Sequence, residues 1–181
     1  MNLKNKIKYS IAALNRKIWP LPEREPSGKF LHIKGCNIVL IFNFSLENDQ
    51  ISLAEQISSI KEKLGDCSKI TICNYSDLIT LSENDEVKSI AVNDFEISGK
   101  PKQNLNTWLR NSNFDILISF VIKENIYCNY LISKIKSAFK AGAYNITNAN
   151  LFDLTIKQES NNIIEQLELF IQYINQLNIN K

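Results

Sequence analysis

The sequence has little of what metal, redox and nucleotide sites are built from. Its 181 residues include one histidine and five glycines. Zinc sites need clustered histidine or cysteine ligands, and no C-x-x-C pair occurs among the four cysteines, which are Cys36, Cys67, Cys73 and Cys128. The sequence therefore predicts reduced thiols, mostly buried as small hydrophobic side chains, with no metal and no cofactor.

Long apolar runs are also missing. No window of about 18 apolar residues occurs, so we expect no transmembrane helix. The N-terminal stretch MNLKNKIKYSIAALNRKIW lacks the apolar run and the small-residue cleavage site of a signal peptide. These absences predict a cytoplasmic protein.

Groups for nucleophilic catalysis are scarce. His32 is the single imidazole, and the sequence contains no G-x-S-x-G elbow. A Cys128–His32 pair stays open as a nucleophile and base. Asp115 lies in the apolar run FDILISF, where we expect it to bond backbone amides at the start of a strand.

What is present is an ordinary globular balance with an uneven charge. Hydrophobic residues make up 44% of the chain and charged residues 22%, which suits one folded domain. Residues 1–34 hold eight Lys or Arg against two Glu, a net charge of +6, so the remainder carries −4 of the overall +2. A basic head on a mildly acidic body indicates an anionic contact or a solvated head.

The basic head is predicted to be an amphipathic helix over residues 1–19, followed by a proline-rich linker (20–29) and an α/β domain (30–181). Helical spacing puts five apolar residues on one face: Leu3, Ile7, Ile11, Leu14 and Ile18. This helix could dock on its own domain through that face, bind a partner protein or a second copy, or rest on an anionic membrane or nucleic acid. The basic residues available for such contacts are Lys4, Lys6, Lys8, Arg16 and Lys17. Nucleic acid is not expected, because interleaved aromatic residues are missing.

The rest of the chain alternates between strand and helix patterns. Strands are predicted at 37–44, 69–75, 87–92, 114–121, 140–146 and 151–157, and helices at 52–64, 105–110, 126–138 and 163–177. Ser52 and Glu55 form a capping box, Gly65 would stop that helix in a left-handed conformation, and Gly142 marks a place where a side chain would not fit. The interpretation is a three-layer α/β fold, Rossmann-like, with a mostly parallel sheet of five or six strands and helices on both faces.

In such sheets ligands bind at the carboxyl ends of the strands. The loop after the first strand, NFSLENDQ, has no glycine and carries Glu47 and Asp49, so a dinucleotide fingerprint and a P-loop are both absent. The weak ligand candidates are Glu47, Asp49, Asp94, Lys100 and Lys123, which could form a receiver-type acidic pocket for Mg²⁺. The alternative is that Asp49 caps a helix and Asp94 opens a turn.

The stretch Gly99-Lys100-Pro101 has the charge for a phosphate but not the spacing of a Walker loop. Pro101 also removes one backbone amide. We interpret the stretch as a turn leading into the next helix, with an anion site as the alternative.

Four stretches carry a resemblance: the basic N-terminal helix, NIVLIFNF with its acidic loop, GKPKQNLNTWLRNSNFDILISF and YLISKIKSAFKAGAYN. Over roughly residues 4–145 the chain resembles an uncharacterised family of small Bacteroidota proteins, a domain of unknown function. That resemblance implies a fold and no activity. The order of FDILISF, helix and KAGAYN is also similar to the N-terminal half of heptosyltransferase-like glycosyltransferases, which implies a half-fold without catalysis.

The function expected from these patterns is a non-catalytic binding or adaptor domain with a protein partner, in the cytoplasm and able to contact a membrane peripherally through the N-terminal helix. The alternative is a small α/β transferase or hydrolase that binds a phosphorylated ligand at the carboxyl ends of the strands.

Overall fold

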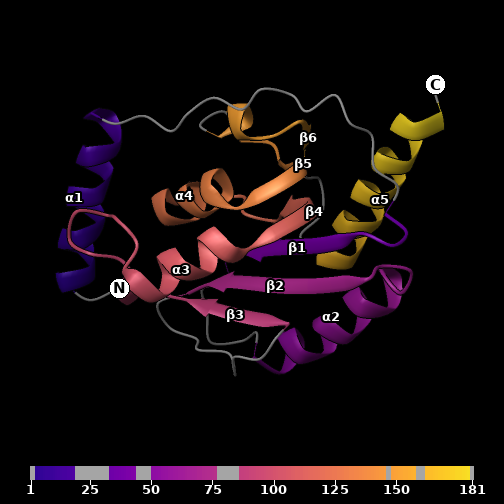
Figure 1. Ribbon diagram of the computed structural model, residues 1–181, viewed down its shortest axis with the longest axis horizontal. Helices are drawn as coiled ribbons and strands as arrows, with labels where there is room; N and C mark the ends of the chain where they lie inside the picture. Colours follow the sequence, from indigo (N-terminus) through magenta and orange to yellow (C-terminus); the bar gives the residue numbers. More distant parts are fainter. Residues whose placement is uncertain are drawn as a thin grey trace.

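The computed structural model describes residues 3–18, 33–43, 50–76, 86–145, 148–157 and 162–179. Six strands form one sheet: β1 (Asn37–Phe42), β2 (Lys69–Tyr75), β3 (Val87–Ile90), β4 (Asn113–Ser119), β5 (Lys136–Ala143) and β6 (Leu154–Ile156). Their order is β3-β2-β1-β4-β5-β6, and every neighbouring pair is parallel (Figure 1). The predicted α/β fold is confirmed, with a sheet that is parallel throughout its described strands.

Helices cover both faces of this sheet. They are α2 (Gln50–Lys63), α3 (Gln103–Asn111), α4 (Ile126–Lys134) and α5 (Ile163–Ile179). Helix α1 (Leu3–Ile18) lies beyond the ends of the strands (Figure 1), and η1 (Val92–Asp94) and η2 (Ala149–Leu151) are short 3₁₀ turns. Apolar residues of α3 and α4 join one core, and those of α2 and α5 join the other. The sheet and the helices on its two faces therefore form three layers, with one core on each side of the sheet. No helix in the described ranges is long and apolar enough to cross a membrane.

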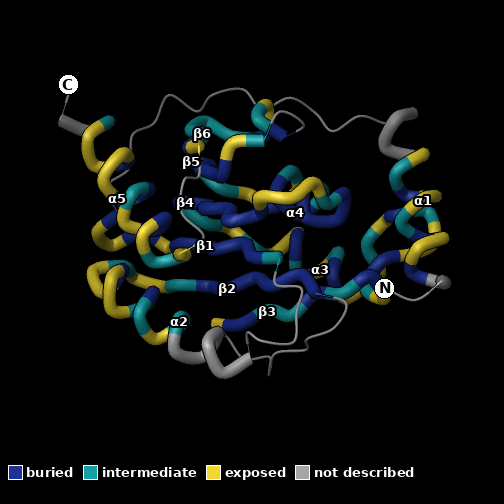
Figure 2. The backbone as a smooth tube through the Cα atoms, turned by 180° about the vertical axis from the view of Figure 1, so that it is seen from behind, coloured by how far each residue is buried: buried dark blue, intermediate teal, exposed yellow. Residues whose placement is uncertain are grey.

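The strands separate the two cores by simple alternation. In β1, Val39 and Ile41 face the α3/α4 core, whereas Ile38, Leu40 and Phe42 face the α2/α5 core, and all five are at most 1% exposed. Figure 2 shows the result as dark blue, the colour of buried residues, along the central strands. Burying one such side chain contributes about 1.5–3 kcal/mol, so a nearly continuous apolar run is stable only with both faces covered.

One predicted helix is too long. The pattern from Ile126 to Ala138 predicts a helix over its whole length, but α4 ends at Lys134 and β5 begins at Lys136. Ile135 is already extended, with φ −64° and ψ 123°, and the following residues pair with β4. Sheet pairing overrides the helical spacing at this point.

The second predicted helix differs at both ends. It begins at Gln50, two residues before Ser52, so Ser52 lies inside the first turn; the side chains of Ser52 and Glu55 lie outside the described residues. The predicted left-handed stop at Gly65 is wrong, because positive φ angles occur at Gly35 and Gly99. At the end of α2 the Gly65 amide instead donates to the Glu62 carbonyl at 3.3 Å, a tighter closing turn.

Several local predictions are confirmed. The Asp115 carboxylate accepts a hydrogen bond from the Asn37 amide at 2.8 Å, which ties the starts of β4 and β1 together. A Cβ at Gly142 would lie 2.4 Å from the Phe152 ring, so a side chain does not fit there. Three of the cysteines are buried, Cys67 is half-buried, and all four are free thiols. The predicted linker and the stretch 77–85 lie outside the described residues.

Candidate functional site

The strand order indicates at which edge of the sheet a ligand would bind. Successive strands run outward from β1 on one side and from β4 on the other, so the order reverses between β1 and β4. Ligands of open α/β sheets bind beyond the carboxyl ends of the strands at such a reversal. In Figure 1 the arrowheads point towards α1, at the left of the molecule. The N-terminal helix therefore occupies the side of the sheet where a ligand would be expected.

Helix α1 packs against this edge through a face made of small and polar residues. Its buried residues are Asn5, Lys8 and Ala12. The Lys8 ammonium donates to the carbonyl oxygen of Phe95 at 3.3 Å, just after β3. Ala12 lies against the turn after β3: a Cβ added at Gly99 would come within 2.8 Å of the Ala12 Cβ. Gly99 is needed twice, for this close approach and for its φ of +83°.

An aromatic cluster lies under α1. The Tyr127 ring, at the start of α4, has its centroid 6.0 Å from the Tyr9 ring, 5.5 Å from the Tyr75 ring and 4.6 Å from the Phe95 ring. Burial raises the pKa of the Tyr9 phenol, and a hydrogen bond with the backbone of Ile126 opposes that shift. The cluster thus links α1 to the end of β2, to the segment after β3 and to α4.

A second face of α1 carries an apolar ridge, Ile7, Ile11 and Leu14, that is exposed to solvent. These side chains are 52%, 37% and 61% exposed, although Ala12 between them is 3% exposed. The helix docks on its own domain, as one of the three interpretations has it, but not through the predicted apolar face. Helical geometry explains the difference: at about 100° per residue, residues 5, 8 and 12 are centred about a third of a turn away from residues 7, 11 and 14.

The start of α4 is closed by its own cap. Asn125 follows β4 at the order reversal, and its Oδ1 accepts hydrogen bonds from the amides of Tyr127 at 3.0 Å and Cys128 at 3.1 Å. Free amides at a helix start are what a phosphate would use. Here a side-chain oxygen of the chain itself occupies two of them.

The three predicted ligand residues that the structure describes, Asp94, Lys100 and Lys123, lie at the same edge but on loops that are two strands apart. Asp94 and Lys100 follow β3, whereas Lys123 follows β4, with β2 and β1 between these strands. The Asp94 carboxylate accepts the Ala91 amide at 2.8 Å, so it caps the 3₁₀ turn η1. Asp94 is the last residue of that turn, whereas the alternative interpretation had it opening one. Glu47 and Asp49 lie outside the described residues. Within the described ranges, no three His, Cys, Asp or Glu side chains are grouped as metal ligands.

Gly99-Lys100-Pro101 is a turn. The Glu96 amide donates to the Lys100 carbonyl at 2.8 Å, and the Gly99 amide donates to the Glu96 carbonyl at 3.0 Å. The Lys100 side chain is exposed. The turn therefore contacts α1 and leads into α3. Its Gly99 amide already donates to a carbonyl and is not available to an anion.

The basic residues of the N-terminal helix separate into two groups. Lys8 is 7% exposed and belongs to the seat of α1 on the domain. Lys6 is exposed. The side chains of Lys4, Arg16 and Lys17 lie outside the described residues.

The thiols are held in their protonated form. Burial raises the pKa of Cys73 to about 12 and that of Cys67 to about 11, and it raises the pKa of Cys128 well above its usual value. The thiolate is the reactive species, so these positions are those of inert core residues. The Cys128–His32 pair gains no support, because Cys128 is fully buried; His32 lies outside the described residues.

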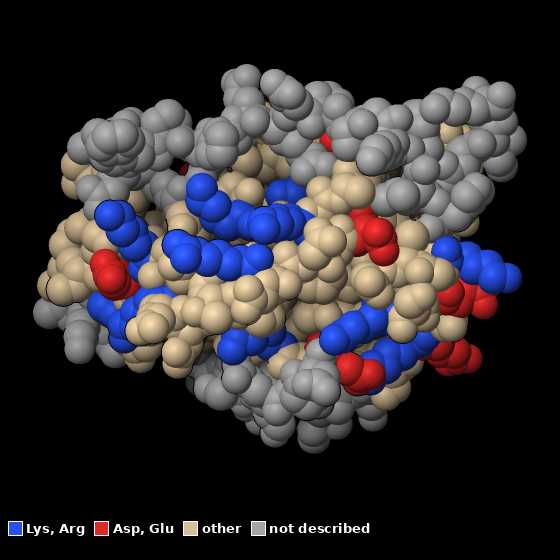
Figure 3. Space-filling view, viewed as in Figure 1, with Lys and Arg blue, Asp and Glu red and all other residues tan. Residues whose placement is uncertain are grey.

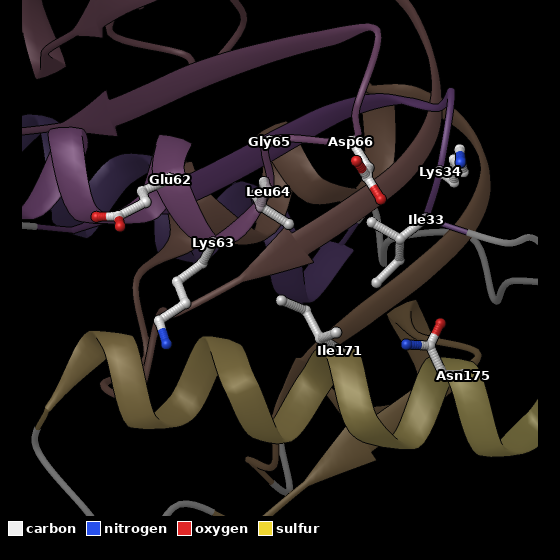
Figure 4. Close-up of a pocket in the computed structure, with 9 residues that line it drawn as sticks. All are labelled: Ile33, Lys34, Glu62, Lys63, Leu64, Gly65, Asp66, Ile171 and Asn175. Carbon is white, nitrogen blue, oxygen red and sulfur yellow. The ribbon is translucent and has the colours of Figure 1, made fainter.

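An open groove lies at the opposite, amino edge of the sheet (Figure 4). It measures about 430 Å³ and is lined by the turn before β1, the end of α2 and the middle of α5. Ile33, Leu64 and Ile171 point into it, whereas Glu62 points away. Lys63 on its rim forms an ion pair with Glu168. The groove carries charges of both signs, Lys34, Lys63, Glu62 and Asp66, and this mixture selects no particular ligand.

Sequence reasoning missed the seat of α1. Its signals were present as the small pair Ala12-Ala13 and as Gly99, but the strong spacing of the apolar residues outweighed them. Neither Ala12 nor Gly99 alone predicts that the helix approaches the turn closely. The contact between them can be recognised only once the fold has brought the two residues together.

The profile of a family described as "Family of unknown function (DUF6913)" matches residues 23–177. The chain belongs to this family. The matched segment begins after α1 and runs further towards the C-terminus than the predicted 4–145; the attribution to Bacteroidota stays a prediction.

Among solved structures the chain is similar to a glycosyl transferase family 9 protein from Veillonella parvula DSM 2008, with a TM-score of 0.47 and 16% identity. The match covers 81% of this chain and 42% of the glycosyl transferase chain, so this chain spans less than half the length of that protein. The weak likeness to such enzymes suggested by the sequence is therefore present in the fold, and it carries nothing about activity. No curated protein matches.

Proposed function

We propose that the protein is a non-catalytic binding or adaptor domain of the cytoplasm that holds a protein partner through the outward ridge of α1. One observation carries this proposal: α1 sits on the domain by its small, polar face and turns Ile7, Ile11 and Leu14 to solvent. Isolated exposed apolar residues are common, but three at one-turn spacing on one helix face form a contact surface.

The ligand edge supports a non-catalytic role. Helix α1 rests against the segment after β3 and against the start of α4, which are the segments that would hold a ligand. Beneath it lie packed aromatic rings, and Asn125 occupies the first amides of α4. A small ligand would have to displace α1 and these contacts before it could reach the order reversal.

The alternative proposal is a small α/β transferase or hydrolase that binds a phosphorylated ligand. It is favoured by the strand order, which has the reversal of nucleotide-binding folds, and by Asp94, Lys100 and Lys123 at the carboxyl ends of the strands. Glu47 and Asp49 would belong to the same site by sequence.

A thermal-shift screen separates the two. Ligand binding to the native state must raise the melting temperature, by an amount that grows with ligand concentration. Nucleotides, sugar nucleotides and Mg²⁺ are tested singly and in combination, against the full chain and against Lys100→Ala and Lys123→Ala variants. We expect no shift. A reproducible rise that either variant removes would decide for the enzyme.

A further inference from the structure

A second open groove lies at the amino edge of the sheet, between the end of α4 and the starts of β4 and β5. It measures about 520 Å³, and three of the residues that line it are lysines: Lys134, Lys136 and Lys140. Lys140 is 4% exposed and its ammonium donates to the Ile132 carbonyl, so the fold holds this cation in place. Lys134 and Lys136 are exposed.

Arg110 extends the same positive surface onto α3. The Lys136 ammonium donates to the Arg110 carbonyl at 3.4 Å, so the end of α3 lies beside the start of β5. Figure 3 shows two neighbouring rows of lysine and arginine atoms in the middle of the molecule, where Figure 1 has α3 and α4, with no acidic side chain between them. We call this surface, made of Arg110, Lys134, Lys136 and Lys140, the basic groove.

Lysines near α2 are paired with carboxylates, unlike those of the basic groove. Lys61 forms an ion pair with Glu86, and Lys63 forms one with Glu168 of α5. At the lower right of Figure 3, where Figure 1 has α2, basic and acidic side chains accordingly lie together. The three exposed cations of the basic groove form no ion pair with any residue in the described ranges.

Two acidic residues border the basic groove and leave it positive. Asp115 lines it and Asp153 lies beside Lys140, but their carboxylates accept hydrogen bonds from the backbone amides of Asn37 and Lys140. Four cations against two carboxylates give a net charge of +2. This excess is local, because residues 35–181 together carry a net charge of −4.

The helix ends account for part of this positive charge. Arg110 and Lys134 lie in the last turns of α3 and α4, and the ammonium groups of Lys136 and Lys140 donate to carbonyls near those ends. A helix C-terminus carries about half a negative charge, so the two ends offset about one of the two excess charges. The remainder attracts an anionic group from outside the chain.

The shape of the basic groove favours an extended chain over a small ligand. Sites for small molecules enclose most of the surface of their ligand, whereas this groove is shallow and open to solvent. Its cations come from α3, from α4 and from β5. A flexible segment with successive acidic side chains can therefore meet several of them at once.

Nucleic acid fits this surface less well than an acidic protein segment. Proteins hold single strands by stacking bases on aromatic rings. The aromatic side chains of α3, β4 and α4 beside the groove, Trp108, Phe114 and Tyr130, are partly buried and pack against the core. The Lys134 ammonium lies 5.8 Å from the centre of the Tyr130 ring, so this ring is also covered by a cation. These rings serve the fold, and the groove presents charge.

We infer that the basic groove binds an acidic, extended segment of a partner protein, whose carboxylates lie on Arg110, Lys134 and Lys136. The Arg110 guanidinium can hold a carboxylate by two parallel hydrogen bonds, and the lysines act as point charges. This surface is separate from the ridge of α1. The inference therefore goes beyond the proposed function and can fail without it.

The test uses a fluorescein-labelled peptide of about ten glutamates, which reaches about 33 Å when extended, titrated with the full chain in fluorescence anisotropy. The variant Lys134→Gln/Lys136→Gln removes two charges from the groove. The matched control, Lys69→Gln/Lys157→Gln, removes two exposed lysines from elsewhere, so both proteins have the same net charge. Arg110→Gln is a second, independent variant of the groove.

We expect the unchanged chain to bind this peptide with a dissociation constant below about 100 µM at about 50 mM salt. Lys134→Gln/Lys136→Gln should weaken binding at least about fivefold, Arg110→Gln at least about twofold, and the control less than about twofold, because only the groove variants remove cations that face the peptide. Raising the salt to about 500 mM should remove most of the binding, since the charges are then screened. Circular dichroism checks that the variants keep the fold.

Three results would overturn the inference: no saturable binding of the peptide, equal weakening by the groove variants and the control, or loss of binding in Lys6→Gln instead, which would place the peptide on α1. Tighter binding of a thymidine oligonucleotide of equal length, lost in the groove variants, would replace the protein segment by nucleic acid. Displacement of the peptide by inorganic phosphate at about 1 mM, which adds little to the ionic strength, would replace it by a small anion. Both would also overturn the inference. The proposed function is tested separately, by the thermal-shift screen with Lys100→Ala and Lys123→Ala.

Discussion

Replacing Gly99 by alanine tests whether α1 sits where the structure places it. Gly99 has a φ of +83°, and a Cβ there would lie 2.8 Å from the Cβ of Ala12. A left-handed backbone costs an L-residue with a Cβ about 1–2 kcal/mol. Two carbons at this distance are well inside the optimum of about 3.5–4.0 Å, so α1 must also retreat, at about 1 kcal/mol or more.

We therefore expect Gly99→Ala to lower the free energy of unfolding by about 2–3 kcal/mol. In an Ala12→Gly background the 2.8 Å contact is gone; what remains is the backbone strain, about 1–2 kcal/mol, and a milder 3.3 Å approach to the Cα of residue 12. Ala12→Gly alone costs about 1 kcal/mol of helix propensity, which the double-mutant cycle removes.

Urea unfolding of the four proteins gives the coupling energy, and hydrogen exchange reports on α1 directly. Gly99→Ala should speed exchange at the amides of α1 before it affects the central strands. Effects that add to within about 0.5 kcal/mol would refute the reasoning, because residues that do not touch show no coupling.

Three further outcomes are expected. Asn125→Ala should destabilise the protein by about 1 kcal/mol in urea, since two α4 amides lose their acceptor, and a Ser at this position should restore most of it. Gly142→Ala should cost about 1–3 kcal/mol and much less in a Phe152→Leu background, because the new Cβ meets the ring at 2.4 Å. Stability should fall as the pH rises from 9 to 12: unfolded thiols ionise near 9.0 while Cys67 and Cys73 hold their protons to about 11 and 12, so the unfolded state binds fewer protons there. Cys73→Ala should flatten that fall in urea midpoints measured between pH 8 and about pH 10.5; an unchanged slope would contradict the burial of this thiol.

The sheet could be predicted because its strands are set by local composition. Runs such as Asn37–Phe42 and Lys69–Tyr75 are apolar on both sides, and parallel strands covered by helices need that. The roles of Asp115 and Gly142 could also be predicted. A carboxylate at the start of a strand commonly bonds backbone amides, and a glycine inside a strand commonly marks a place without room for a side chain. The cue for each of these features lies in the local sequence, although the amide that Asp115 binds belongs to Asn37, 78 residues away.

Features that depend on distant pairing could not be read in the same way. Residues 135–138 have helical spacing but pair with β4. The seat of α1 depends on Ala12 meeting Gly99, 87 residues away in sequence, as Lys8 meets Phe95. The apolar stripe predicted the wrong docked face, because spacing tells which residues share a face and not which face the domain covers.

The orientation of α1 is the point on which the account depends, and a nuclear Overhauser spectrum of the full chain measures it. We expect cross-peaks from the Ala12 methyl group to the α-protons of Gly99 and from the Tyr9 ring to the Tyr127 ring. The methyl groups of Ile7 and Leu14 should show none to the segments after β3 and β4. Cross-peaks from Ile7 or Leu14 to those segments, in place of those from Ala12, would show that the apolar face is the docked one and would contradict the proposed contact surface.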